Sequence, residues 1–190
     1  MARGLLTVVS GPSGVGKDSV LKRVFELDPS LAYSVSYTTR QPRPGEVEGV
    51  DYSFVGDPEF DRLVKSGELL EWADVHGHRS GTGRRRVEGA LETGKDIVLN
   101  VDVQGGMSVR RQMPDALLIF LAPPSVEELR RRLAERGTET GEELARRQAD
   151  AETEMGYSDR YDAVVVNDDL ERAVQEVLDL IHQHRGRDRT

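Results

Sequence analysis

The sequence predicts an α/β fold in which a central parallel sheet is flanked by helices. Three observations predict it: four short, nearly continuous apolar runs, helical segments that alternate with them, and a glycine-rich turn after the first run. Strands of a parallel sheet are buried on both faces, which favours continuous apolar runs over strict alternation. Strands alternating with helices imply right-handed crossovers, and ligands then bind beyond the carboxyl ends of the strands.

The positions of the elements follow from these patterns. Strands are expected at residues 5–10, 96–101, 117–121 and 163–166. The clearest helices are expected at residues 18–26, 126–135 and 170–184. In the last of them, apolar residues recur at helical spacing from Leu170 to Ile181, which predicts a stripe that faces the core.

The glycine-rich turn reads Gly-Pro-Ser-Gly-Val-Gly-Lys and spans residues 11–17. Its glycines allow backbone N–H groups to turn toward a phosphate chain, and the positive end of the following helix points at the same anion. Lys17 can reach the β- and γ-phosphates as a mobile charge. The turn therefore predicts a site for a phosphate chain that consists of Ser13, Gly14, Val15, Gly16, Lys17, Asp18 and Ser19.

The residue after this lysine departs from the usual phosphate-binding motif. The motif places Ser or Thr there to hold Mg²⁺, but this chain has Asp18, with Ser19 one position later. A carboxylate can bind a hard cation, although it adds negative charge beside the phosphates. Two interpretations stay open: Asp18 contacts the metal directly or through water, or it is a favourable acid in the first turn of the helix.

Composition limits the possible function classes. The chain has 190 residues, a formal charge of −8 and no cysteine. This length suits a single α/β domain with inserted subregions. The negative charge argues against broad binding to nucleic acid or anionic membranes, and the lack of cysteine excludes disulfides and thiolate metal sites. No apolar run approaches the ~20 residues of a membrane span, so we expect a cytoplasmic protein.

Two segments interrupt the alternation of strands and helices. Residues 34–94 begin with turn-rich, basic sequence and predict a small inserted subdomain. Residues 133–157 are dense in charge, which is compatible either with a solvated helix face or with a mobile lid that carries arginines. The core of the domain is then expected at about residues 1–33, 95–132 and 158–184.

Two arginines, Arg40 and Arg43, lie on either side of Pro42 in the first part of the insert. Proline fixes φ, so the guanidinium groups can be held in place, and two forks that converge on one anion suit a phosphate monoester. Tyr52 can add a phenolic hydrogen bond. Taken alone, this stretch is also compatible with a charged surface loop, but beside a phosphate-binding loop it predicts a second phosphate site.

Further stretches occur in a fixed order along the chain. They are Thr-Thr-Arg-Gln-Pro-Arg-Pro-Gly-Glu at 38–46, Leu-Leu-Glu-Trp-Ala at 69–73, Val-Asp-Val-Gln-Gly at 101–105 and Val-Val-Asn-Asp-Asp-Leu at 165–170. From residue 4 to about residue 182, the chain resembles the guanylate kinase family of P-loop nucleoside monophosphate kinases. The resemblance implies transfer of the γ-phosphate of MgATP to GMP or dGMP. It also makes residues 34–94 the monophosphate-binding subdomain and residues 133–157 the lid.

The resemblance also implies residue roles. The GMP phosphate is bound by Arg40, Arg43, Tyr52 and the residue at Ser80, and guanine is bound by Ser36, Glu71, Thr82, Asp102 and Gly105. Lys17, Arg43, Arg136 and Arg147 act as catalytic residues, Arg132 and Asn167 lie near the ATP base, and Mg²⁺ lies near Asp18, Ser19 and Asn100. Guanine chemistry agrees, since carboxylates suit its N1–H and N2 amino donors and hydroxyls suit its O6 acceptor.

Three positions depart from the family pattern. The family has a hydroxyl or small residue at Asp18, an aspartate that helps hold Mg²⁺ water at Asn100, and a second phosphate-binding tyrosine at Ser80. We expect Asp18 and Asn100 to lie near the same phosphates, so that one carboxylate replaces the other.

Two other function classes stay open. One is a related kinase for another acceptor, such as a modified nucleotide or ribose 1,5-bisphosphate, because Lys17, Asp18, Ser19 and Asn100 also resemble ribose 1,5-bisphosphate kinases. The other is a non-catalytic binding module, against which the intact lysine and lid arginines argue. The expected partners are ATP and GMP, without nucleic acid or membrane, in a monomer or a homodimer.

Overall fold

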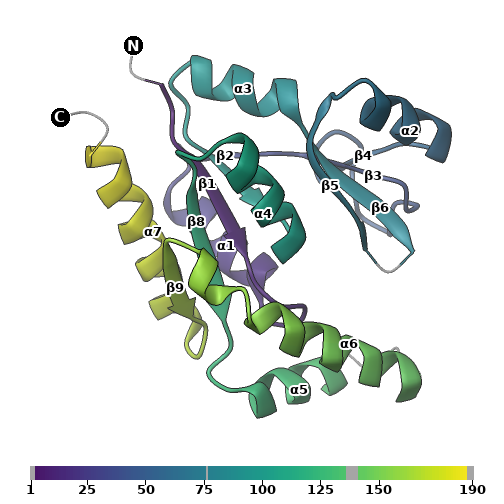
Figure 1. The fold of residues 1–190 in the computed structure, drawn as a ribbon. Coiled ribbons are helices and arrows are strands. Elements are labelled where there is room, and N and C mark those ends of the chain that lie inside the picture. Colours follow the sequence, from purple (N-terminus) through teal and green to yellow (C-terminus); the bar gives the residue numbers. More distant parts are fainter. Residues whose placement is uncertain (1–2, 76, 136–140, 188–190) are drawn as a thin grey trace.

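The computed structural model describes residues 3–75, 77–135 and 141–187 and contains two sheets (Figure 1). The central sheet is parallel throughout, with the strand order β2-β7-β1-β8-β9. Its strands are β1 (Leu6–Ser10), β2 (Ala32–Tyr33), β7 (Ile97–Asn100), β8 (Leu117–Ala122) and β9 (Ala163–Val166). The expected α/β fold is therefore confirmed, and each of the four expected strands ends within one residue of its expected bounds.

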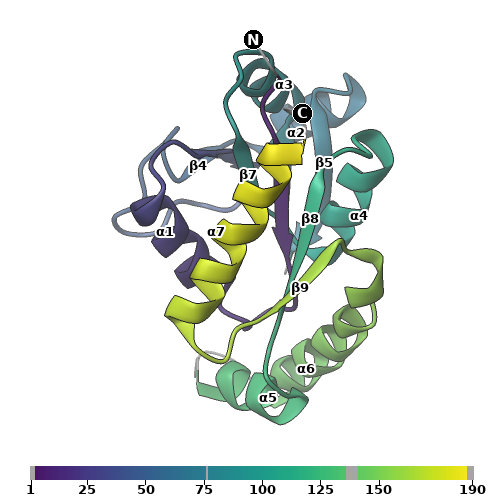
Figure 2. The ribbon, with the colours of Figure 1, turned by 90° about the vertical axis from the view of Figure 1, so that its left-hand side faces the viewer.

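Helices cover both faces of this sheet (Figures 1 and 2). On one face, Leu5 and Val9 pack in a cluster with α1 (Lys17–Leu27) and α7 (Leu170–Arg187). On the other face, Leu6 and Val8 pack in a cluster that includes residues of α3 (Arg84–Glu92) and α4 (Val103–Gln112). This two-sided burial explains why the first strand is continuously apolar.

Helix α7 confirms most of the expected core-facing stripe. Val174, Val177 and Ile181 are fully buried in the cluster shared with α1, and Leu178 is nearly so. The expectation is wrong for Leu170, which is 39% exposed because it begins the helix at the edge of the packed face.

The inserted segment forms a second, four-stranded sheet with the order β4-β3-β6-β5. The pairing of β3 with β4 is parallel, and the other two pairings are antiparallel. A small core of Phe60, Leu63 and Leu69 lies between this sheet and α2. Leu70 instead packs in the main core cluster, which joins the two sheets. The bounds are β3 (Ser36–Thr38), β4 (Tyr52–Phe54), α2 (Asp57–Lys65), β5 (Leu69–Val75) and β6 (His78–Gly83).

Two packed helices, α5 (Val126–Glu135) and α6 (Gly141–Met155), lie beyond the carboxyl ends of β1 and β8 (Figure 1). Their shared core contains Leu129, Leu133 and Ala151. Outside this core the helices are charged, as in the pair of Arg130 with Glu152. A short 3₁₀ turn (Ser158–Arg160) then leads to β9.

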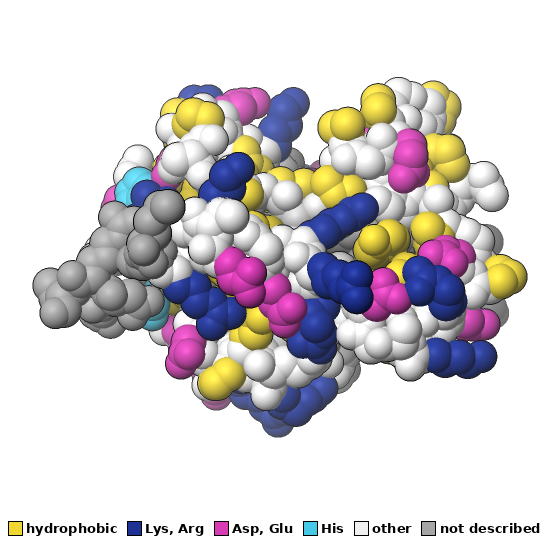
Figure 3. Space-filling model, turned by 90° about the horizontal axis from the view of Figure 1, so that it is seen from above, with side chains coloured by type: hydrophobic (Ala, Val, Ile, Leu, Met, Phe, Trp, Pro, Cys, Tyr) yellow, Lys and Arg dark blue, Asp and Glu magenta, His cyan; other side chains and the backbone are white. Residues whose placement is uncertain are grey.

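The surface seen from above carries intermixed basic and acidic side chains (Figure 3). Several charges on and beside α2 are paired, as in the contacts of Arg62 with Glu59 and Glu68. None of the helices in the described parts of the chain has the length and apolarity that a membrane crossing requires.

Candidate active site

A cleft of about 850 Å³ lies where the central sheet, the second sheet and α6 meet. It gathers predicted site residues from all three parts of the chain. Those that line it are Ser13, Lys17, Ser36, Arg40, Arg43, Tyr52, Glu71, Ser80, Asn100, Asp102 and Arg147.

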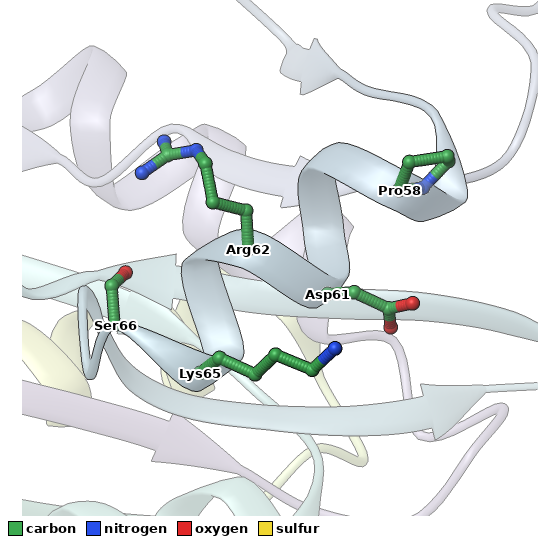
Figure 4. A pocket seen from close by; sticks show the side chains of 5 residues that line it. All are labelled: Pro58, Asp61, Arg62, Lys65 and Ser66. Atoms are coloured by element: carbon green, nitrogen blue, oxygen red, sulfur yellow. The ribbon is translucent and has the colours of Figure 1, made fainter.

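A second hollow of about 510 Å³ lies along α2 (Figure 4). Its lining consists of Pro58, Asp61, Arg62, Lys65 and Ser66, all on or next to one helix. The Arg62 guanidinium is already paired with Glu59 and Glu68 at 2.8 and 2.6 Å. This hollow contains no residue of the phosphate-binding loop, so the larger cleft is the candidate active site.

The phosphate-binding loop joins β1 to α1. Gly14 and Gly16 have φ values of 85° and 97°, a left-handed region that glycine adopts without strain. Gly16 also caps α1, so the positive end of the helix faces the loop. The Lys17 ammonium donates hydrogen bonds to the Gly11 and Pro12 carbonyls, at 2.6 and 3.3 Å. The lysine is thus held over the loop, where an anion is favoured.

Arg132 and Asn167 lie behind this loop. The Asn167 side-chain amide donates to the Val15 carbonyl at 2.8 Å, and Arg132 donates to the same carbonyl at 3.3 Å. Arg132 also donates to the Asn167 carbonyl at 3.0 Å. Here both side chains satisfy a backbone acceptor of the loop, a supporting contact that the sequence did not predict. Their contact with an ATP base stays a prediction.

Asp18 and Asn100 are in contact, which confirms the expected proximity of these two departures. The Asn100 side-chain amide donates to Asp18 Oδ1 at 2.8 Å. Asp18 belongs to the first turn of α1, and Asn100 is the last residue of β7. Asp18 and Ser19 are both exposed, so their oxygens are accessible beside Lys17.

The two arginines of the 40–46 loop differ in availability. The Arg40 guanidinium donates to both carboxylate oxygens of Glu46, at 2.7 and 2.5 Å. Its Cζ atom lies 4.8 Å from the centre of the Tyr52 ring. The Glu46 carboxylate also accepts the backbone N–H of Arg43 at 2.7 Å. These contacts, that of Arg40 above all, lower the pKa of Glu46 to about 2.

The two forks therefore differ in their contacts, and their convergence on one phosphate stays a prediction. The Arg40 fork is occupied because Glu46 closes the loop against it. The Arg43 side chain is exposed at the cleft, and no described residue forms an ion pair or hydrogen bond with its guanidinium.

Thr82 and Glu71 lie opposite each other on β6 and β5. The Thr82 hydroxyl donates to Glu71 Oε1 at 2.5 Å. Thr82 is almost fully buried and does not line the cleft. The single hydroxyl proton of Thr82 is thus engaged by the carboxylate, and the implied contact of Thr82 with O6 stays a prediction. In this arrangement Thr82 orients Glu71, and of the two hydroxyl residues predicted to bind O6 only Ser36 lines the cleft.

Asp102 and Gly105 complete this end of the cleft at the start of α4. Asp102 Oδ1 accepts the Gly105 N–H at 2.6 Å and so caps the helix. A Cβ at Gly105 would lie 2.8 Å from Glu71 Oε2, so the missing side chain lets the backbone approach the carboxylate. Burial raises the pKa of Glu71 to about 7, and the nearby charge of Asp102 adds to the rise.

Comparison with known proteins agrees with this geometry. The family model described as guanylate kinase matches residues 3–184. The chain is 48% identical over 183 residues to a guanylate kinase of Rubrobacter xylanophilus, covering 96% of both chains. It is 51% identical over 180 residues to one of Nocardia farcinica, covering 94% of this chain and 93% of that one. The chain belongs to the guanylate kinase family.

A solved structure supports the same assignment. The guanylate kinase of Anaplasma phagocytophilum superposes with a TM-score of 0.79 at 33% identity, covering 96% of this chain and 87% of that one. The expected resemblance and the P-loop kinase fold are thus confirmed, and the cleft between the two sheets is where guanylate kinase chemistry is to be sought.

Helix α6 contributes side chains that the sequence reasoning did not select. Arg147 lines the cleft as the family resemblance implies, whereas Arg136 lies outside the described residues. Arg147, Asp150 and Glu154 are spaced by three and four residues, and this spacing could have indicated one helix face that carries both signs of charge. The other unselected polar residues of the cleft include Asp74, His78, Gln104 and Arg146.

Proposed function

We propose that this chain transfers the γ-phosphate of ATP to GMP, giving ADP and GDP, within the cleft described above. The observation that carries the proposal is a single cleft that unites the phosphate-binding loop and Lys17 with Arg43 and the carboxylates of Glu71 and Asp102. Family membership supports it, because guanylate kinases are ATP:GMP phosphotransferases.

The reaction is an in-line transfer. An oxygen of the GMP phosphate forms a bond to the γ-phosphorus, while the bond from this phosphorus to the bridging oxygen of ADP breaks. Positioning and neutralisation of spread negative charge dominate such a step. Lys17 and the loop amides bind the donor phosphates, Arg43 orients the acceptor phosphate, and Arg147 brings positive charge from α6.

Guanine suits the carboxylate end of the cleft. With Thr82 engaging Oε1, the Oε2 atom of Glu71 can accept a guanine donor, and Asp102 retains an oxygen that Gly105 does not use. Adenine has no hydrogen at N1, so a carboxylate there would face a lone pair. The Ser36 hydroxyl suits O6.

Mg²⁺ fits beside the loop. When bound with ATP, the ion neutralises charge on the phosphate oxygens. The described residues include no group of three or more acidic or histidine side chains that could hold a metal alone. Mg²⁺ is often held by one or two carboxylates together with substrate phosphates, and the contacting pair Asp18 and Asn100, with Ser19, provides suitable oxygens.

The Asp18–Asn100 pair gives a prediction about this metal. Asp18→Ser should weaken Mg²⁺ binding and slow turnover, although it restores a common motif residue. Adding Asn100→Asp should recover much of the loss, because a carboxylate returns to the same contact. We expect a coupling of about 1 kcal/mol or more. Calorimetric Mg²⁺ titration of the ADP complex, alongside Mg²⁺-dependent rates, measures it. Additive effects would show that the two substitutions act independently.

The raised pKa of Glu71 predicts a pH dependence. GMP needs the ionised carboxylate, so KM for GMP should rise as pH falls below about 7, by up to about tenfold per pH unit. Glu71 should also favour folding most below its ordinary pKa of 4.5, and this contribution should be lost as pH rises toward 7. Steady-state kinetics from pH 5.5 to 8.5 measures the change in KM for GMP.

The Glu71→Gln variant separates this titration from that of the GMP phosphate, whose second pKa is about 6. The phosphate titrates in both proteins, and only the wild type should show the additional dependence. Parallel pH profiles for KM would contradict the assignment.

A coupled assay with GMP, dGMP, AMP, CMP, UMP and ribose 1,5-bisphosphate tests the proposal as a whole. We expect GMP to give the highest kcat/KM, with dGMP as the second acceptor. Turnover of ribose 1,5-bisphosphate without GMP would support the related sugar-phosphate kinase, and binding of nucleotides without turnover would support a binding module.

A further inference from the structure

Glu154, near the carboxyl end of α6, reaches into the phosphate-binding loop. Its Oε2 atom accepts the backbone N–H of Ser13 at 3.2 Å, across 141 positions of sequence. The carboxylate is partly buried in the cleft and interacts electrostatically with Lys17. A negatively charged group thus accepts a backbone N–H of the loop at the place where the proposed function requires a phosphate of ATP.

The contact belongs to a wider attachment between helices α5 and α6 and the loop. Three consecutive loop residues, Ser13, Gly14 and Val15, are held by α5 and α6. A Cβ at Gly14 would lie 2.8 Å from Leu133 Cδ2, and Arg132 donates to the Val15 carbonyl at 3.3 Å. Neither the apolar contact nor the arginine engages an N–H group of the loop, whereas Glu154 accepts that of Ser13.

We propose, on the basis of the proposed function, that Glu154 is an internal competitor of phosphate at the phosphate-binding loop and weakens the binding of nucleotide phosphates there. The carboxylate must be displaced before a phosphate can bind. The apparent affinity of every phosphate ligand of the loop is therefore its intrinsic affinity multiplied by the fraction of molecules in which the loop is free. Because the factor is the same for every such ligand, it weakens their binding without changing the order of preference among them.

A purely supporting role for Glu154 predicts the opposite result. If the carboxylate only held the loop in shape, its removal would loosen the loop and weaken nucleotide binding. If it competes with phosphate, its removal strengthens binding of every ligand that uses the loop and leaves GMP binding at the far end of the cleft unchanged.

Titration calorimetry in magnesium-free buffer can decide between these roles. Glu154→Gln keeps the shape but removes the charge, and Glu152→Gln is the matched control, because Glu152 pairs with Arg130 on the charged outer side of the same helix. We expect Glu154→Gln to bind ADP and inorganic tripolyphosphate ~3–10-fold more tightly than wild type. GMP affinity and the control variant should match wild type. Equal or weaker binding of both polyphosphates would overturn the proposal.

Failure of the proposed function gives a different result. A wild-type protein that binds ADP but never phosphorylates GMP would contradict the proposed function, and the ADP affinities of wild type and Glu154→Gln could still be compared. The contact itself can be tested by hydrogen exchange in the free protein. The Ser13 amide should exchange faster in Glu154→Ala than in wild type, and ADP should slow it in both. Equal exchange rates in the two free proteins would show that Glu154 does not occupy the loop.

Discussion

Replacing Arg43 with methionine is expected to lower kcat/KM for GMP by roughly 30- to 1,000-fold, a loss of about 2–4 kcal/mol of transition-state stabilisation. The size of the effect follows from how the two arginines of the loop are paired. Arg40 already balances the Glu46 carboxylate, whereas the Arg43 guanidinium lies exposed at the cleft. Methionine keeps much of the apolar stem and removes only the charge and the fork.

Steady-state kinetics with each substrate varied in turn is the measurement for Arg43→Met. KM should rise much more for GMP than for ATP, and kcat should fall because the attacking phosphate is less well oriented. Arg62→Met is the matched control, since Arg62 lies in the same subdomain at the hollow along α2. Equal damage with both substrates, or a similar loss in the control, would contradict the placement of the acceptor phosphate.

Glu71→Gln is expected to lower kcat/KM for GMP by roughly 5- to 150-fold, or about 1–3 kcal/mol, with ATP binding nearly intact. Thr82 donates to Glu71 Oε1 at 2.5 Å, so the glutamine oxygen will stay with Thr82. The glutamine NH₂ then points at the guanine donors, and two donors face each other in a buried site.

The comparison variant for Glu71 is Glu68→Gln. Glu68 precedes the same strand but binds Arg62 and Ser66 outside the cleft. It should therefore keep wild-type kinetics with GMP. Wild-type efficiency of Glu71→Gln with GMP would show that this carboxylate does not bind guanine.

The main sheet could be predicted from sequence because its strands are buried on both faces. Residues 117–121, for instance, are apolar without interruption and are all fully or almost fully buried. The short strands could not be located in the same way. β2 has only two residues and forms by pairing with β7, a contact across more than 60 positions that leaves no local pattern.

The site could be predicted as a set of residues but not as a set of pairings. About half of the residues chosen from sequence line one cleft, since the motifs lie at strand ends and at loops that the topology brings together. The partners of Arg40, Thr82 and Ser13 were not foreseen. Each depends on which carboxylate reaches which donor in three dimensions, and spacing in sequence does not specify that.

Strand β5 links substrate recognition to folding. Leu70 is fully buried in the main core, and its neighbour Glu71 faces the acceptor end of the cleft. The second sheet therefore cannot unfold without exposing part of the main core, so we expect the two sheets to melt cooperatively. Because a ligand stabilises the state that binds it, a nucleotide held by Glu71 should protect both sheets against heat and proteolysis.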